Sequence, residues 1–289
     1  MEENTALRDL IINGDAETEL KKIPSESVNC IITSPPYYMQ RDYSTNIQIG
    51  NEETPEAYVQ RLIGVFKECL RILREDGTLW LNLGDKYQNG ELLGMPWMVV
   101  FALKEQGWML RSDIIWHKPN AMPSSVSNRP TTDHEYIFFF SKSKTYYYDI
   151  DSIREPHVTF SENSRMKGGR NHFGKVNGTP EQGKNSGNQN LHNGNWDKAF
   201  HPLGRNRRTV WEIPLSKFRE AHFAVFPEKL VELCLLAGCP EDGIVLDPFI
   251  GSGTTAVVAQ KFGRSYIGID SNPEYCEMAN KRLLQKSLI

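Results

Sequence analysis

The stretch from residue 243 to residue 270 constrains the fold of this chain more than any other. It opens with an apolar run that reads as a buried strand, Gly243–Asp247, and then enters a glycine-rich turn, Gly251-Ser252-Gly253. The apolar run Ala256–Gln260 has the composition of a helix, and a second strand follows at Arg264–Asp270. A strand, a turn, a helix and a strand in this order are typical of a parallel sheet. We therefore expect an α/β fold.

The glycine turn has the chemistry of a site for a nucleoside-containing cofactor. Gly251 and Gly253 allow the backbone to approach a ligand closely, and the helix that follows offers unpaired N–H groups. Asp270, at the tip of the second strand, is placed to bind a ribose diol. NAD would also suit this unit, but the spacing is not GxGxxG. The carboxylate of Asp247 would repel a pyrophosphate and attract a cationic sulfonium, which favours S-adenosylmethionine.

A second strand tip, far earlier in the chain, carries two consecutive prolines. The apolar run Val28–Ile32 leads directly into Thr33-Ser34-Pro35-Pro36-Tyr37. Because proline donates no hydrogen bond and restricts the residue before it to extended geometry, we expect a stiff loop that ends the strand abruptly. This loop presents the Ser34 hydroxyl, the Pro35 carbonyl and the Tyr37 ring, a combination suited to a flat, amino-bearing ring. A proline-rich turn without a ligand is the alternative.

The remaining apolar patterns predict further strands and helices around these two segments. Expected strands are Leu10–Ile12, Thr78–Asn82, Leu110–Trp116 and Glu135–Phe140, and expected helices are Glu17–Ile23, Pro55–Leu73, Met95–Gln106, Glu228–Leu236 and one beginning at Asn272-Pro273. Asp15 follows the first strand, where it is either a solvated turn residue or a ligand contact. Lys118 ends another strand, where it can reach a ligand.

Composition indicates a reduced protein without membrane anchorage. The five cysteines show no CxxC spacing, so we expect buried thiols and no metal site. No signal peptide opens the chain, and no apolar run approaches the ~20 residues that a membrane span needs. We therefore expect a cytoplasmic protein. The net charge of −3 gives no global signal for nucleic acid, so such a signal has to be local.

A local signal lies in the central segment of the chain. From residue 161 to residue 208 there is almost no apolar periodicity, and glycine and asparagine abound. Between residues 153 and 220, twelve basic residues face six acidic ones, so the local charge is +6. A basic segment that cannot fold alone suits phosphate contact and ordering on nucleic acid, although a solvated loop has the same composition. We expect phosphate contacts from the following residues: Lys118, Arg170, Arg205, Arg207 and Arg208.

Taken together, the motifs resemble those of the amino-methylating DNA methyltransferases of the β arrangement. Thr33–Tyr37 is similar to the catalytic motif of that family, and Asp247–Thr255 is similar to its cofactor motif. Phe223–Pro227 matches the segment that precedes the cofactor motif, and Asp15 and Asp270 match its adenine-side and ribose-side positions. The catalytic motif comes first and a variable segment follows it, which is the β order.

The resemblance implies a circularly permuted, Rossmann-like class I fold with a mixed seven-stranded sheet. It implies one methyltransferase domain in two halves, residues 1–152 and 213–289, around a target-recognition insert at residues 153–212. The implied catalytic residues are Ser34, Pro35, Pro36 and Tyr37. The implied cofactor-binding residues are Asp15, Thr33, Phe223, Phe226, Pro227, Asp247, Pro248, Phe249, Gly251, Ser252, Gly253, Thr254, Thr255 and Asp270. The partner is double-stranded DNA, with a cognate restriction endonuclease as a further candidate and a monomer or homodimer as the assembly.

The implied reaction transfers a methyl group from S-adenosylmethionine to the exocyclic amine of a flipped-out base. Ser34 Oγ and the Pro35 carbonyl would accept hydrogen bonds from the amine as positive charge develops, while Tyr37 stacks on the base. In the family, serine at the position of Ser34 usually accompanies cytosine-N4 activity and aspartate accompanies adenine-N6 activity, so we expect cytosine N4. The chain has no Pro-Cys dipeptide, which excludes the cysteine-dependent cytosine-C5 reaction.

Several alternatives remain at this point. Adenine-N6 methylation uses the same site, and methylation of RNA or of a protein glutamine uses similar chemistry. A catalytically inactive DNA-binding module would not need both the Ser34 loop and Asp270. An NAD-dependent oxidoreductase leaves the double proline and the basic insert unexplained.

Overall fold

The computed structural model describes residues 7–40, 48–156, 201–215 and 227–286. Two compact units are present: residues 1–148 together with 209–289, and residues 149–208. The first unit contains the sheet and the helices. Within the described ranges, no helix combines the length and the apolar composition needed to cross a membrane.

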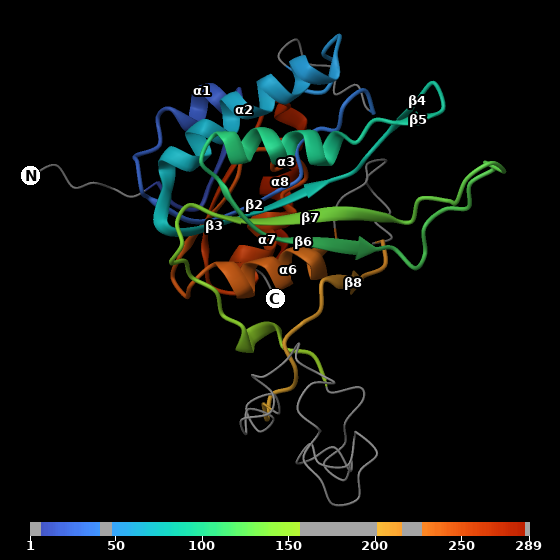
Figure 1. The fold of residues 1–289 in the computed structure, drawn as a ribbon. Helices are drawn as coiled ribbons and strands as arrows, with labels where there is room; N and C mark the ends of the chain where they lie inside the picture. Colours follow the sequence, from blue (N-terminus) through green and yellow to red (C-terminus); the bar gives the residue numbers. More distant parts are fainter. Residues whose placement is uncertain (1–6, 41–47, 157–200, 216–226, 287–289) are drawn as a thin grey trace, which may run out of the picture. The chain divides into compact units, whose positions relative to one another are not determined.

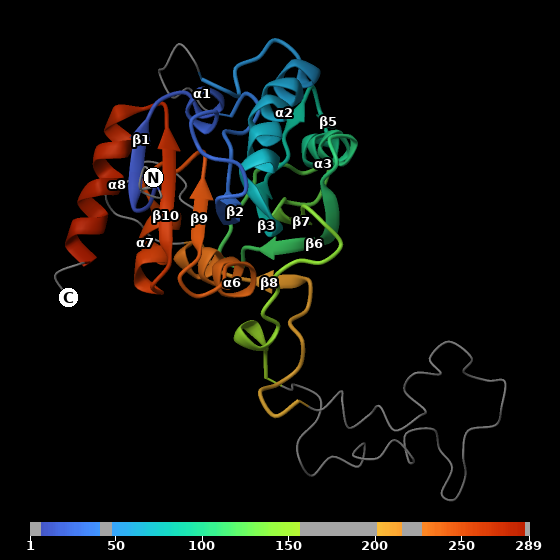
Figure 2. The same ribbon diagram turned by 90° about the vertical axis from the view of Figure 1, so that its left-hand side faces the viewer.

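The first unit is built on one eight-stranded sheet with the order β1-β10-β9-β2-β3-β7-β6-β8. All neighbours pair in parallel except β7, which runs antiparallel to both β3 and β6. Figure 2 shows the strands from β1 to β6 side by side. Their bounds are β1 Leu10–Asn13, β2 Val28–Thr33, β3 Leu73–Leu83, β6 Met109–His117, β7 His134–Ser141, β8 Val210–Glu212, β9 Ile244–Asp247 and β10 Ser265–Asp270.

The helices cover the sheet in two groups. The first group, α1, α2 and α3, packs in a row, and α6, α7 and α8 form a second row. Figure 1 shows α1, α2 and α3 on one side of the strands, with α6 and α7 on the other. The bounds are α1 Ala16–Leu20, α2 Pro55–Ile72, α3 Met95–Glu105, α6 Glu228–Gly238, α7 Thr254–Lys261 and α8 Pro273–Lys286.

Helix α2 illustrates how the sequence determines these elements. Thr54 caps its first turn by accepting a hydrogen bond from the Ala57 N–H at 3.2 Å, and Pro55 fills the first helical position. Its apolar residues recur every three or four positions, and Leu62, Phe66 and Cys69 are completely buried. These residues therefore belong to the core, as the periodicity predicts.

Most of the predicted elements are present, but three differences concern the sheet. The predicted helix Pro55–Leu73 ends one residue earlier, at Ile72, and the chain turns directly into the eleven-residue β3. The predicted strand at residues 78–82 is the buried part of that longer strand. The sheet has eight strands rather than seven, because the short strand β8 pairs with β6. A two-stranded hairpin, β4 Tyr87–Gln88 and β5 Glu91–Leu92, was also not predicted.

The second unit contains the described ends of the insert. A single turn of 3-10 helix, Asp151–Ile153, precedes an antiparallel bridge between Glu155 and Arg205. The Arg205 guanidinium donates to Glu155 at 2.8 Å, so the two ends are joined by backbone and side chain alike.

Candidate active site

The carboxyl ends of the parallel strands bring distant sequence motifs to one edge of the sheet. Asp270, Asp247 and Thr33 end β10, β9 and β2, which are adjacent strands. Ser34 follows β2 directly, and Asp15 follows β1, the strand next to β10. Ligands of open α/β sheets bind at this edge, so the predicted catalytic and cofactor motifs lie where a shared site requires them.

The proline loop after β2 is held from several sides. The Tyr58 hydroxyl, on α2, donates to the Pro36 carbonyl at 2.9 Å. After the loop, the Met39 N–H donates to the Gly50 carbonyl at 2.6 Å. Gly50 has a φ of +110°, and a side chain there would meet the Tyr37 carbonyl. The loop is therefore a fixed element, as the two prolines predict.

A fully buried carboxylate joins this loop to the cofactor motif. One Asp247 oxygen accepts from Thr33 Oγ1 at 2.6 Å and from the Phe249 N–H at 3.1 Å. The other oxygen accepts from Thr255 Oγ1 at 2.7 Å. We call Thr33, Asp247 and Thr255 the closed joint, since all three are buried. Burial is the main influence on Asp247 and raises its pKa to about 6, against the opposing effect of these hydrogen bonds.

The closed joint changes the interpretation of several predicted cofactor residues. The Asp247, Thr33 and Thr255 side chains are no more than 1% exposed and are bonded to one another. The Asp247 side chain therefore has no exposed surface with which to contact a sulfonium directly. These residues fix the distance between the catalytic loop and the glycine turn.

The glycine turn contains two glycines with different functions. Gly251, with a φ of +50°, has nothing within 4 Å of the place where a side chain would lie, so the space in front of it is open for a ligand. Gly253, with a φ of +86°, would instead drive a side chain into Ala279 on α8 at 2.7 Å. Arg282, also on α8, donates to the Ser252 carbonyl and to Thr254 Oγ1. Helix α8 thus packs against the turn at Gly253, whereas the turn is open to a ligand at Gly251.

The two acids at the neighbouring strand tips have the donor and acceptor pattern that a ribose and an adenine require. Asp270 accepts from the Gly251 N–H at 2.9 Å and from the Asn272 N–H at 2.8 Å, and is only partly buried. Each oxygen retains acceptor capacity for a hydroxyl group. Asp15 caps α1 by accepting from the Thr18 N–H at 3.0 Å. The Gly14 N–H donates to the Asp270 carbonyl at 2.9 Å, which keeps the two tips together. These residues fit S-adenosylmethionine.

Beside the proline loop lies a polar cluster that the sequence did not predict. The Tyr37 hydroxyl donates to Glu135 Oε2 at 2.7 Å and approaches Asn82 Oδ1 at 3.1 Å. Ser34 Oγ donates to the same hydroxyl at 3.3 Å, and Asn82 Nδ2 donates to Glu135 at 3.0 Å. Lys118 Nζ donates to the other Glu135 oxygen. We call these five residues the open cluster, because Ser34 and Tyr37 are only partly buried.

Gly84 gives the Tyr37 ring its place in the open cluster. A side chain at Gly84 would lie 2.7 Å from Tyr37 Cε2 and 3.4 Å from Glu135 Cγ. The ring therefore lies against bare backbone at the end of β3. Burial, followed by the negative charge of Glu135, raises the pKa of Tyr37 well above its usual value, so its hydroxyl keeps its proton.

Lys118 and those arginines expected to contact DNA that the structure describes have partners within the protein. The Lys118 side chain is only 15% exposed, pairs with Glu135 and lies 4.6 Å from the centre of the Trp116 ring. Arg205 binds Glu155, and Arg207 donates to the Ile153 carbonyl at 2.9 Å. Arg208 also has a partner. Arg170, Phe223 and Phe226 lie outside the described residues, and Pro227 precedes α6 as its N-terminal cap residue.

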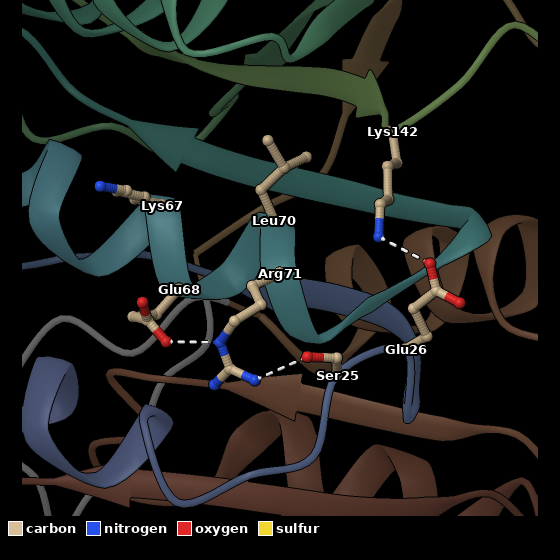
Figure 3. Close-up of a pocket in the computed structure, with 7 residues that line it drawn as sticks. All are labelled: Ser25, Glu26, Lys67, Glu68, Leu70, Arg71 and Lys142. Atoms are coloured by element: carbon tan, nitrogen blue, oxygen red, sulfur yellow. Dashed lines mark hydrogen bonds and ion pairs between the residues drawn. The ribbon is translucent and has the colours of Figure 1, made fainter.

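A separate hollow of about 620 Å³ lies at the opposite end of β2. Figure 3 shows its lining side chains. Among them, Arg71 donates hydrogen bonds to Glu68 and Ser25, and Lys142 donates one to Glu26. Ser25 and Glu26 precede β2, whereas Ser34 follows it. Because the Arg71 and Lys142 cations already have partners, this hollow is not a second candidate for the active site. Within the described ranges, no group of acidic, histidine and cysteine side chains could hold a metal ion, and all five cysteines are buried free thiols.

Sequence reasoning missed Glu135 and Asn82, although one signal pointed to Glu135. The predicted strands at residues 110–116 and 135–140 are joined without an intervening helix, which favours an antiparallel pair. Glu135 is the second residue of β7 and pairs with Trp116 near the end of β6. The start of a reversed strand lies at the same edge as the ends of its parallel neighbours, and this places Glu135 within hydrogen-bond distance of Tyr37.

Comparison with known proteins agrees with this geometry. Residues 28–281 match the family model described as DNA methylase. The chain is 40% identical over 302 aligned residues to the type II methyltransferase M.Cfr9I of Citrobacter freundii, covering 94% of this chain and 87% of that protein. It is 39% identical over 305 aligned residues to M.SmaI of Serratia marcescens, covering 96% and 91%.

Two solved structures show the same fold. The PvuII DNA methyltransferase, described as cytosine-N4-specific, aligns with a TM-score of 0.68 at 22% identity, covering 96% of this chain and 87% of that one. The M1.HpyAVI complex with S-adenosylmethionine aligns with a TM-score of 0.59 at 19% identity, covering 94% and 98%. At these identities the likeness concerns the fold alone.

Proposed function

The chain belongs to the DNA methylase family of amino-methyltransferases, and from this premise we propose that it methylates the exocyclic N4 amine of cytosine in duplex DNA. The predicted resemblance and the predicted class I α/β fold are confirmed, and S-adenosylmethionine is the cofactor. When bound, that cofactor supplies a methyl group on a positively charged sulfur.

One observation carries the proposal. Ser34 lies at the same sheet edge as the open space before Gly251 and the carboxylate of Asp270. A base amine at Ser34 would therefore face a methyl donor held by the neighbouring strand tips. Serine rather than aspartate at this position favours cytosine over adenine.

The proposed roles follow from what each group can donate or accept. Ser34 Oγ and the Pro35 carbonyl accept hydrogen bonds from the amine and stabilise the positive charge that develops there. Tyr37 presents its ring to the flipped base. Gly251 and Asp270 contact the cofactor nucleoside, Asp15 contacts its adenine side, and Phe249 is a partly buried wall of the same turn.

We also propose that the basic residues of the insert contact DNA phosphates, as their charge predicts. Lys118, Arg205 and Arg207 are bonded within the protein, so DNA would have to displace those partners or share them. Replacing Arg205 or Arg208 with glutamine should weaken binding to all DNA sequences and reduce the slope of the salt dependence by about 1 for each phosphate lost. An unchanged slope would count against these contacts.

The base is tested by nucleoside mass spectrometry of DNA that has been incubated with the enzyme and isotopically labelled cofactor. We expect labelled N4-methylcytosine, formed far more slowly by the Ser34→Ala variant that serves as control. Labelled N6-methyladenine without N4-methylcytosine would support the adenine alternative, which has the same site. Sequencing of the methylated DNA would give the recognition sequence. The names of the type II relatives make a restriction endonuclease with the same recognition sequence a proposed partner.

A further inference from the structure

The open cluster contains a continuous chain of hydroxyl groups that ends on a carboxylate. Ser34 Oγ donates to Tyr37 Oη at 3.3 Å, and Tyr37 Oη donates to Glu135 Oε2 at 2.7 Å. The first member is the proposed acceptor for the target amine. The last member has a side chain that is only 17% exposed.

Methylation of an exocyclic amine creates a proton that has to leave. The lone pair of such an amine is delocalised into the ring, so the nitrogen becomes strongly acidic once it has gained a methyl group. A serine hydroxyl is a poor base and cannot keep this proton. A nearby group that is a stronger base has to accept the proton, and the Glu135 carboxylate lies two hydrogen bonds away.

We propose that Glu135 is a positioning residue for methyl transfer and also the destination of the proton released by the methylated amine, which reaches it through Ser34 and Tyr37. This inference rests on the proposed function but holds for cytosine N4 and adenine N6 alike. Glu135 acts through the Tyr37 hydroxyl, whose direction it fixes.

The atoms and charges balance along this path. The target nitrogen forms a bond to the methyl carbon while the methyl–sulfur bond breaks, and that electron pair stays on sulfur. One N–H proton then passes to Ser34 Oγ, the Ser34 hydroxyl proton passes to Tyr37 Oη, and the Tyr37 proton passes to Glu135 Oε2. The products are a neutral secondary amine, a thioether and a neutral Glu135, which releases its proton to solvent before the next turnover.

Three neighbouring residues hold the groups of this path in position. Asn82 donates to the same Glu135 oxygen at 3.0 Å and to the Tyr136 carbonyl at 3.1 Å, which fixes the carboxylate between β3 and β7. Lys118 compensates the charge of the carboxylate through the other oxygen. Gly84 leaves room for the Tyr37 ring, as a side chain there would collide with it. Each contact keeps the hydroxyl of Tyr37 between Ser34 and Glu135.

The test compares Glu135→Gln, Glu135→Asp and Tyr37→Phe with wild type in single-turnover methylation from pH 4 to pH 9. The glutamine is isosteric and still accepts a hydrogen bond from Tyr37, but it cannot take a proton. We expect a loss of about 100-fold in rate, in line with the effect of a general base. Dissociation constants for cofactor and DNA should stay within about twofold. The acidic limb of the wild-type pH profile should disappear in this variant and return in Glu135→Asp.

Tyr37→Phe breaks the path in the middle and leaves Glu135 paired with Asn82 and Lys118. Its loss should be similar, and the double variant with Glu135→Gln should be no slower than either single variant. Glu26→Gln, at the other end of the sheet, is the matched control and should retain the wild-type rate and pH profile, since Glu26 pairs only with Lys142 among described residues.

Wild-type rates and pH profiles in both Glu135→Gln and Tyr37→Phe would overturn the inference. Equal losses without any change of pH profile would do the same, because they would show a structural role alone. If Glu135→Gln fails to fold, Tyr37→Phe decides by the same criteria. A wild-type enzyme that methylates no base amine would refute the proposed function instead, so the two failures are distinguishable.

Discussion

The closed joint and the open cluster lie at the same edge of one sheet, and each contains a carboxylate that binds a hydroxyl next to or within the catalytic loop. Asp247 is completely buried and receives only neutral donors, from Thr33, Thr255 and a backbone N–H. Glu135 is paired with an ammonium group and is linked to the partly exposed Ser34. The joint cannot exchange protons with a ligand without opening, whereas the cluster can. Similar groups therefore serve structure in one place and chemistry in the other.

Substitution of Ser34 should have the largest effect on activity and should leave the closed joint intact. We expect Ser34→Ala to reduce the rate of methyl transfer about 100-fold, since it removes both a charge-stabilising acceptor and the first step of the proton path. The free energy of unfolding should change by less than about 0.5 kcal/mol, as expected for a partly exposed residue that supports no packing. Single-turnover kinetics and urea unfolding measure the two effects.

Ser25→Ala is the matched control for that variant. Ser25 precedes β2 as Ser34 follows it, and its hydroxyl contacts Arg71 at 3.0 Å. This control should keep the wild-type rate. A slow Ser25→Ala variant would mean that changes anywhere along β2 disturb the site, and the loss in Ser34→Ala could then not be attributed to chemistry.

The second prediction concerns the stability of the closed joint as a function of pH. Burial raises the pKa of Asp247 from 3.8 to about 6, so the folded protein binds a proton between these values that the unfolded chain does not. The resulting stabilisation, about 3 kcal/mol, is fully present below about pH 4 and is lost as the pH rises through 6. Asp247→Asn resembles the protonated acid and should lack this dependence.

Urea unfolding of wild type and Asp247→Asn at pH 8, 6, 5 and 4 checks this prediction. The difference in unfolding free energy should shift in favour of wild type by about 3 kcal/mol as the pH falls from 8 to 4. Taking this difference cancels the groups that titrate equally in both proteins. Parallel pH profiles would mean that Asp247 ionises as an exposed carboxylate does, and the joint would not be closed.

The sequence predicted the catalytic loop and the glycine turn because both are local. Two prolines fix the backbone of the residues that precede them, and the glycines of the turn have positive φ, which few other residues adopt. The alternation of strands and helices then sufficed to bring the two motifs to one edge. The confirmed fold depends on these short-range signals.

What sequence reasoning missed depends on tertiary contacts. Thr33 and Thr255 are polar residues within ligand motifs, and only the packing of β2 against β9 shows that their hydroxyls are consumed by Asp247. The reading of Gly253 as a ligand-approach residue overlooked Ala279 on α8. The three-residue strand β8 has too little sequence to carry a pattern, and its pairing with β6 defines it.

The smallest expected effect concerns Thr255, and it tests whether this residue belongs to the closed joint or contacts the cofactor. Thr255→Val keeps the shape of the side chain but removes the donor to Asp247, which should cost about 1 kcal/mol of unfolding free energy near pH 7. Because that hydrogen bond lowers the pKa of Asp247, its loss should also move the pH window of the previous prediction upward. Thr255→Ser retains the hydroxyl and should behave as wild type in both respects. Calorimetry of cofactor binding to the same two variants separates the two roles of Thr255. If Thr255→Val lowers the cofactor affinity but changes neither the stability nor the pH window, the hydroxyl is a ligand contact. The closed joint would then consist of Thr33 and Asp247 alone.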